Sequence, residues 1–309
     1  MILQSTLGMG LFAEIKNMIR TIYLAKYNNY NNKIILDYSQ EFFPYKNSIN
    51  TCEFSNILIL KDDIQIYDDL KIYDINFNDS RLFTEFIHCD QQLVTTMKDF
   101  YPLIEFRLQH NNKKYNHLLK LNRIFNSFFS INQNIINDVD IFYNINMQDY
   151  FVLGIHYRAS CVHNCEVKGT SEVNYHLKIN EVFKKIDNII RNKDKFKIFL
   201  ATDIKLIQDK FIQKYTDKLI FNKNNIYMSN NPTDSMEPHM GFSLVPKNLN
   251  DKKFVDFFHK NKPGLNGGIQ LILDTLILSK CNYFIPSHSN LSDFVFILNP
   301  NIEYSYYTN

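Results

Sequence analysis

The chain has 309 residues, of which 45% are hydrophobic and 21% charged, and its formal net charge is +2. This composition excludes a disordered or fibrous protein, and the near-neutral charge gives no sign of a nucleic-acid partner. The length leaves room for two domains of ordinary size.

The sequence also bears on where the protein works. The N-terminal 20 residues contain Glu14 and lack a long apolar core, which argues against a signal peptide. No window approaches the roughly 18 consecutive apolar residues of a transmembrane helix. The five cysteines are odd in number and unevenly spaced, which argues against a disulfide framework. We therefore expect a cytoplasmic protein without an integral membrane segment. A truncated form of an anchored protein is the alternative that stays open.

The first predicted elements form a β-α-β unit. Residues 2–6 predict a short strand, and Gly8 and Gly10 predict a turn. Apolar residues at helical spacing over 11–23 predict a helix, and residues 33–37 predict a second, buried strand. This order is typical of a parallel sheet.

The next segment carries weaker signals. Residues 57–60 and 64–67 predict strands, and 83–100 and 115–132 predict helices. Residues 133–149 are rich in Asn and contain few periodic signals, so we predict a domain boundary there. The expected domains are residues 1–145 and 146–309.

The second half alternates strands and helices. Strands are predicted at 151–157, 196–202 and 282–286, and helices at 176–191, 205–215, 269–279 and 289–298. The expected fold class is therefore α/β, with two Rossmann-like parallel-sheet domains facing a central cleft. Ligands of such sheets bind at the carboxyl ends of the strands, so the loops after Tyr157, Thr202 and Pro286 should line the cleft.

The strand at 151–157 leads into His156-Tyr157-Arg158. Because side chains in a strand alternate with period two, His156 and Arg158 should share a face. An Arg at this position can hold a phosphate through two parallel hydrogen bonds. A structural ion pair is the alternative that the residues alone leave open.

Two carboxylates are candidates for ligand contacts. Asp203 follows the strand at 196–202, where it either caps the next helix or contacts a ligand hydroxyl. Asp274 lies in a nearly apolar helical run, where a carboxylate is costly unless it has partners. Asp274 is therefore predicted to contact a ligand or a backbone amide.

Residues 287–292 run from a strand end into a helix. The backbone N–H groups at the start of that helix, together with the hydroxyls of Ser287 and Ser289, would suit a phosphate. An ordinary helix cap is the alternative interpretation.

A possible metal site lies in the loop after Arg158. Cys161, His163 and Cys165 are close enough in sequence to ligate zinc, but their spacing is not that of a standard zinc site. Free loop cysteines are the favoured interpretation, and no metal site is predicted.

In this order, the elements resemble the sugar-nucleotide half of the α-1,6-fucosyltransferase and nodulation-fucosyltransferase group, which is related to the protein O-fucosyltransferases. The resemblance covers about half the chain and leaves residues 38–150 without a clear match. It is carried by GMGLFAEIKNMI (8–19), GIHYR (154–158), FLATD (199–203) and the stretch from 267 to 300.

The resemblance implies a GT-B fold and an inverting transfer of fucose from GDP-fucose to a hydroxyl of a glycan or glycoconjugate, without a metal or other cofactor. Residues 1–145 would form the acceptor-side domain and 146–309 the sugar-nucleotide domain. By resemblance, His156 and Asp274 would hold the guanine, and Arg158 would neutralise the β-phosphate. The implied nucleotide site further includes Asp203, Ser287, Ser289, Asn290, Gly8 and Gly10. Lys168 and Glu172 correspond to a basic and acidic loop, in which Glu172 is the candidate catalytic base.

The loop after Arg158 departs from the family pattern. Ala159 stands where many relatives carry a second basic residue, and the loop is longer by several residues. The departure motivates two alternatives: a transferase of the same fold that uses another sugar nucleotide, and a catalytically inactive nucleotide- or carbohydrate-binding module. The retained His156, Arg158 and Asp274 argue against the inactive module.

Overall fold

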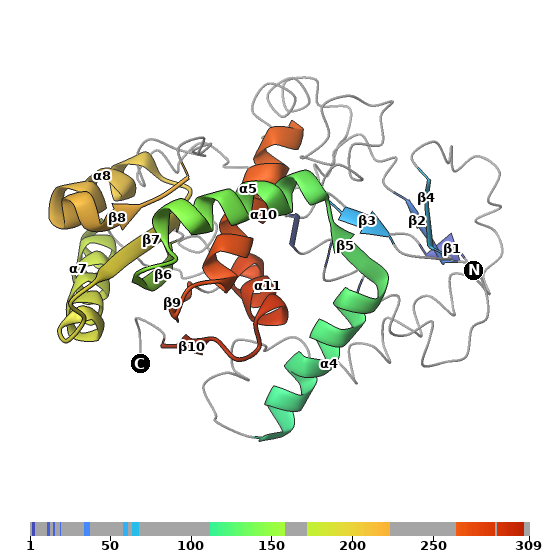
Figure 1. Cartoon of the computed structure of the whole chain (residues 1–309), viewed down its shortest axis with the longest axis horizontal. Coiled ribbons are helices and arrows are strands. Elements are labelled where there is room, and N and C mark those ends of the chain that lie inside the picture. Colours follow the sequence, from blue (N-terminus) through green and yellow to red (C-terminus); the bar gives the residue numbers. More distant parts are fainter. Residues whose placement is uncertain are drawn as a thin grey trace.

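Figure 1 shows a computed structural model of the chain, in which two parallel sheets lie apart with helices between them. The structure describes residues 2–3, 11–12, 15, 19, 34–37, 58–60, 64–67, 112–157, 172–222, 264–287 and 289–305. The mixed α/β fold class predicted from the sequence is confirmed.

The N-terminal sheet contains β1 (Ile2–Leu3), β2 (Ile34–Asp37) and β4 (Ile64–Tyr67), which pair in that order and run parallel. The described residues of the helix predicted between β1 and β2 are helical and buried; they are Leu11, Phe12, Ile15 and Ile19. The predicted β-α-β unit is thus confirmed. The helix predicted at 83–100 lies outside the described residues.

Two helices and an antiparallel pair of strands connect the halves. The helix α4 (Asn112–Phe128) leads into β5 (Phe129–Ile131), which pairs with β3 (Leu58–Leu60). The helix α5 (Gln133–Asn146) follows, where the sequence showed few periodic signals. Its core-facing residues recur at helical spacing and are Ile135, Ile136, Val139, Phe142 and Tyr143. The Asn residues on its other faces obscured this pattern.

The α4 and α5 helices share a core with the second half of the chain. Asn122 of α4 donates from Nδ2 to the carbonyl of Ile297 at 2.8 Å, and Lys280 lies 3.2 Å from the Asp140 carboxylate of α5. The domain boundary at 145/146 stays a prediction.

The C-terminal sheet is parallel, with the strand order β10-β9-β6-β7-β8. Its members are β6 (Phe151–Tyr157), β7 (Phe196–Thr202), β8 (Leu219–Ile220), β9 (Tyr283–Ile285) and β10 (Glu303–Tyr304). The strands β6, β7 and β9 were predicted. The strands β8 and β10 were not, because two residues are too few to carry a pattern.

Helices cover both faces of the C-terminal sheet. They are α7 (Glu172–Ile190), α8 (Lys205–Tyr215) with a 3-10 turn (Thr216–Lys218), α10 (Gly264–Ser279) and α11 (Asn290–Leu298). Alternate residues of β6 divide between two cores. Leu153 and Ile155 pack with α7 and α8, whereas Val152 packs with α5, α10 and α11. His156 has the parity of Val152, so it faces the α10/α11 side.

Gly154 permits a close approach of α10 to β6. A Cβ atom at this position would lie 2.8 Å from Sγ of Cys281 and 3.0 Å from Cδ2 of Leu278. Both neighbours are buried, so neither can move away without disturbing the core. The absence of a side chain at Gly154 therefore fixes the distance between α10 and the strand that carries His156.

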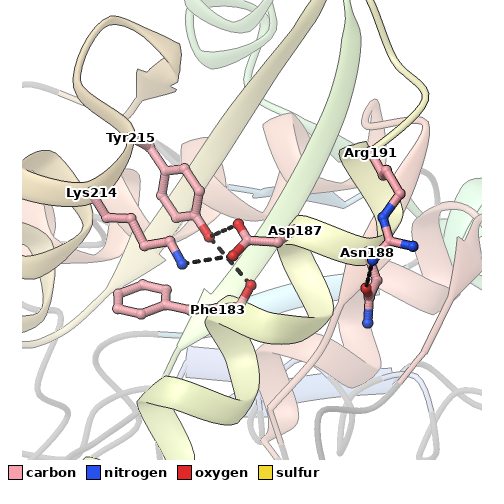
Figure 2. Close-up of polar contacts among 6 residues, drawn as sticks. All are labelled: Phe183, Asp187, Asn188, Arg191, Lys214 and Tyr215. Atoms are coloured by element: carbon pink, nitrogen blue, oxygen red, sulfur yellow. Dashed lines mark hydrogen bonds and ion pairs between the residues drawn. The ribbon is translucent and has the colours of Figure 1, made fainter.

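A polar cluster joins α7 and α8 on the other face of the sheet, as Figure 2 shows. The Tyr215 hydroxyl donates to the Asp187 carboxylate at 3.0 Å, and Lys214 Nζ lies 2.7 Å from the other carboxylate oxygen. The Lys214 ammonium also lies 4.7 Å from the centre of the Phe183 ring. These contacts hold the two helices together.

Candidate functional site

The carboxyl ends of three neighbouring strands lie level with one another. His156 of β6 is in register with Ala201 of β7, and Ile155 is in register with Ile285 of β9. Residues that follow these strands therefore meet at one edge of the sheet, where ligands of open α/β sheets bind.

At this edge, His156 is surrounded by three serine hydroxyls. Its Nδ1 atom lies 2.9 Å from Oγ of Ser292, 3.0 Å from Oγ of Ser287 and 3.2 Å from Oγ of Ser289. All four side chains are buried, with exposed fractions between 1% and 7%. The structure thus brings together three predicted site residues, from segments about 130 positions apart, and adds Ser292.

Ser289 also caps α11. Its hydroxyl accepts a hydrogen bond from the backbone N–H of Ser292 at 3.2 Å, and Asn290 is the first residue of the helix. From the sequence, a helix cap and a phosphate site were alternative interpretations of this segment. In the structure, the Ser289 hydroxyl both caps α11 and contacts His156. Because free N–H groups at a helix N-terminus attract anions, this arrangement suits a phosphate near His156.

Phe12, two residues after Gly10, reaches the same helix. The Phe12 ring packs against the Phe294 ring of α11, with centroids 5.2 Å apart. Gly8 and Gly10 themselves lie outside the described residues, so their place at the nucleotide stays a prediction.

Asp274 lies on α10, and only 7% of it is exposed. Its Oδ1 atom accepts a hydrogen bond from Gln270 Nε2 at 3.3 Å, and the Asn222 side chain also hydrogen-bonds it. Burial raises the pKa of Asp274 to about 7, against the opposing effect of these two hydrogen bonds. The partners are side-chain amides and not the backbone amide that the sequence offered as one alternative, and contact with a ligand stays a prediction for Asp274.

Asp203 does not cap the helix that follows it. The N-cap position of α8 is Ile204, without a side-chain hydrogen bond, and Thr202 Oγ1 accepts from the Ile204 N–H at 3.4 Å. The capping alternative is therefore wrong, because α8 begins one residue later than a cap at Asp203 requires. Contact with a ligand stays a prediction for Asp203.

Several predicted site residues are not described. Arg158 and Lys168 lie outside the described residues, as do Cys161, His163 and Cys165. Glu172 is the first residue of α7, and its proposed role stays a prediction.

The described part of the chain contains neither a candidate metal site nor a candidate membrane span. There, no group of three or more His, Cys, Asp and Glu side chains is placed to hold a metal ion. No helix of that part has the length and apolar character to cross a membrane.

A groove of about 400 Å³ lies away from this edge, between α7 and α8. It is lined by Ile179, Asn180, Phe183, Lys210, Gln213 and Lys214, none of which the sequence marked as a site residue. Lys214 is already bound to Asp187, and the Phe183 ring packs against Phe211 at 5.0 Å. We therefore interpret the groove as a consequence of helix packing.

Three residues that contact His156 or Asp274 were not predicted from the sequence. Ser292 lies within the quoted segment 287–292 but was not singled out. Gln270 precedes Asp274 by four residues, a spacing that puts both on one side of a helix, so a signal for it existed. Asn222 follows the strand β8, which was not predicted, and no motif in the neighbouring sequence indicated a role for Asn222.

No protein-family model matches the chain, and no curated protein matches its sequence. Solved structures match over nearly its whole length. Crystal structures of the fucosyltransferase NodZ from Bradyrhizobium align at a TM-score of 0.57 and 14% identity, over 97% of this chain and 92–93% of that one. The fold is of the GT-B type. A crystal structure of NodZ α-1,6-fucosyltransferase soaked with GDP-fucose aligns at a TM-score of 0.53 and 13% identity, with 97% and 92% covered.

Proposed function

We propose that the chain is an inverting, metal-independent glycosyltransferase that transfers fucose from GDP-fucose to a hydroxyl of a glycan or glycoconjugate. Three lines support the proposal: the motifs in sequence order, the fold shared with NodZ, and the GDP-fucose that one NodZ crystal was soaked with.

One observation carries the proposal furthest. His156 and the serines of the 287–292 segment are separate motifs in the sequence, yet three serine hydroxyls lie within 3.2 Å of His156 Nδ1 at the carboxyl edge of the sheet. A structural role alone does not require a buried histidine and three hydroxyls at the edge where such sheets bind ligands. The start of α11 adds a favourable environment for a diphosphate.

The reaction breaks the bond between the anomeric carbon of fucose and an oxygen of the β-phosphate. Negative charge then develops on the departing diphosphate. In the proposal, Arg158 and the N–H groups at the start of α11 stabilise that charge, so no metal is required. The acceptor oxygen attacks from the opposite face of the sugar, and Glu172 takes its proton.

We further propose that the Asp274 carboxylate accepts hydrogen bonds from N–H groups of the guanine base. An ionised carboxylate offers about four lone-pair positions, and the amides of Gln270 and Asn222 use part of them. The remaining positions can accept two adjacent N–H groups of a base. Asp203 and Lys168 would complete the contacts to the ribose and phosphates, and a cytoplasmic location stays part of the proposal.

The proposal is tested by incubating the protein with GDP-fucose and a panel of glycans that carry free hydroxyls. We expect GDP release, and an anomeric configuration in the product opposite to that of the donor, measured by NMR. Chelation of divalent metals should leave the rate unchanged. Slow GDP release without an acceptor would also support an enzyme, whereas tight GDP binding with no turnover at all would favour the inactive binding module. Turnover of a different sugar nucleotide alone would favour the alternative donor.

A further inference from the structure

The Asp274 carboxylate receives hydrogen bonds from two parts of the chain. Gln270 lies one helical turn earlier on α10, and its Nε2 atom donates to Oδ1 of Asp274 at 3.3 Å. The side-chain amide of Asn222, which follows β8, donates to the same carboxylate. Two segments that are distant in the sequence therefore converge on one acidic group.

Asn222 links this acidic group to the carboxyl edge of the sheet. Ile220 of β8 is in register with Phe199, and Phe199 is in register with Gly154 of β6. Asn222 follows Ile220 by two residues, as His156 follows Gly154 by two. Asn222 thus stands near the level of His156, at the edge where ligands of such sheets bind.

The three side chains offer more than packing alone requires. A carboxylate that is only 7% exposed is costly in a nearly apolar helix, and a neutral amide in place of Asp274 would also accept a hydrogen bond from Gln270. Both partners of Asp274 are neutral, so they support its negative charge without cancelling it. The arrangement therefore leaves acceptor positions on the carboxylate for further N–H donors.

Two anchor points also fix the orientation of the carboxylate. The terminal torsion of an Asp side chain has a broad energy profile, so the group turns easily when nothing holds it. A hydrogen bond from α10 itself and another from the end of β8 oppose this rotation. A fixed carboxylate can bind two adjacent N–H groups at once, whereas a rotating one loses the second bond for part of the time.

We propose that Asn222 and Gln270 are positioning residues, which hold the Asp274 carboxylate in the orientation that accepts two adjacent N–H groups of a purine base. This orientation selects guanine over hypoxanthine, which has the ring N–H of guanine and lacks its exocyclic amino group. The choice of ligand rests on the proposed function. The positioning of the free carboxylate does not.

The helix α10 packs against β6, β7, α5 and α11. The described ionisable side chains of these elements, together with the one directly after α10, are His156, Tyr157, Lys197, Asp138, Asp140, Tyr143, Asp293 and Lys280. All of them are unchanged in the variants below. A difference in the titration of Asp274 between a variant and the wild type therefore reports the hydrogen bond that was removed.

The test removes the amides one at a time and together. Gln270→Met and Asn222→Ala each remove one amide, and methionine keeps the unbranched shape of glutamine. Two controls lose an amide elsewhere. Gln133→Met removes an exposed side-chain amide of α5, and Asn299→Ala removes the amide that donates to the Ser279 carbonyl at 2.8 Å.

Two measurements are made on the full chain. The first is ¹³C NMR titration of the Asp274 carboxyl group without ligand, assigned from an Asp274→Asn sample. The second is calorimetric titration with GDP and with inosine diphosphate, which carries hypoxanthine. We expect wild-type Asp274 to titrate with a pKa of about 7. We also expect the wild type to bind GDP at least about tenfold more tightly than inosine diphosphate.

Each single variant should raise the midpoint of the Asp274 titration, because the lost hydrogen bond stabilises the ionised form. The double variant should bind GDP at least about tenfold more weakly than the wild type, and its affinities for the two nucleotides should lie within about threefold of each other. Gln133→Met and Asn299→Ala should match the wild type in both measurements.

An unchanged midpoint in both single variants would overturn the inference, as would a double variant that prefers GDP as strongly as the wild type does. Failure of the proposed function has a different signature. The wild type would then bind neither nucleotide, while the variants would still raise the midpoint. In that case the two amides hold the carboxylate as proposed, and the base assigned to it is wrong.

Discussion

The two faces of the C-terminal sheet carry polar clusters of different character. On the α7/α8 face, Asp187 binds Lys214 and Tyr215, and the charged groups are opposite in sign and partly exposed. On the α10/α11 face, His156 is buried among serines at the level ends of the strands. The first cluster is explained by two helices that need a polar connection at their surface. The second places more polar groups in the core than packing requires, which is why we propose it as the binding site.

The largest expected effect comes from substituting Arg158, the proposed phosphate contact; Arg191, beside the α7/α8 cluster, is the comparison. Arg158→Ala should lower kcat/KM by about 100–1000-fold, because a cation that stabilises the departing diphosphate contributes about 3–4 kcal/mol in the transition state. Steady-state kinetics with GDP-fucose would measure the loss. Arg191→Ala is the control, since this arginine directly follows α7 and donates to the exposed Asn188 side chain at 2.9 Å (Figure 2). Activity of Arg158→Ala near the wild-type level would contradict the phosphate role.

Asp274→Asn should weaken GDP binding by about 10–100-fold, or about 1.4–2.7 kcal/mol, because an amide cannot accept two N–H groups as a carboxylate does. The pKa of about 7 adds a pH dependence. Wild-type GDP affinity should rise between pH 6 and pH 8, as the carboxyl group loses its proton. Calorimetric titration across this range should show the rise in the wild type and not in the variant.

The same carboxyl group predicts a trend in stability. With its pKa raised, Asp274 keeps its proton in the folded state up to about pH 7, whereas the unfolded chain loses it near pH 4. The folded state binds more protons in this window, so the contribution of Asp274 to the free energy of unfolding falls as pH rises from about 4 to 7. Urea unfolding at pH 5 and pH 8 should show a smaller decline for Asp274→Asn than for the wild type. An equal decline would mean that the carboxyl group is ionised throughout.

Gly154→Ala should destabilise the fold by about 1–3 kcal/mol, because the added methyl group meets Cys281 and Leu278 in a packed core. Since it would push α10 from the strand that carries His156, GDP binding should weaken as well. Denaturant unfolding and GDP titration measure the two effects. A loss of stability with unchanged GDP affinity would show that the site tolerates movement of α10.

The smallest expected effect concerns the α7/α8 face. Burial, and the nearby Asp187 carboxylate, raise the pKa of Tyr215, which therefore stays protonated and donates to Asp187. Tyr215→Phe should lower the free energy of unfolding by about 1 kcal/mol, through the lost hydrogen bond. GDP affinity and turnover should remain at the wild-type level. A clear loss of turnover would place part of the functional site on this face.

Strong local patterns made much of the second half predictable. The bounds of β6, β7 and α8 match the expected ranges, since their apolar periodicity is undisturbed. The helix α5 was missed because Asn residues surround its apolar stripe, and β8 because two residues carry no period. These elements depend on tertiary packing, which local sequence does not record.

The residues of the candidate site likewise include some that local sequence patterns predicted and some that they did not. His156, Ser287 and Ser289 were found because they follow predicted strands, and the parallel sheet then brings strand ends together. Asn222 was not found, because its contact with Asp274 joins the end of β8 to the middle of a helix about 50 residues later. The capping alternative for Asp203 failed because a cap position depends on where the helix begins, and helix boundaries are the least certain part of a sequence prediction.

The most direct test of the central claim, that the α10/α11 face binds a guanosine diphosphate sugar, is a thermal-shift panel with GDP, GDP-fucose, UDP and ADP. We predict that GDP and GDP-fucose raise Tm, with a stabilisation of about 2.7 kcal/mol at 100 times the dissociation constant, while UDP and ADP do not. Stabilisation by UDP without stabilisation by GDP would contradict the account.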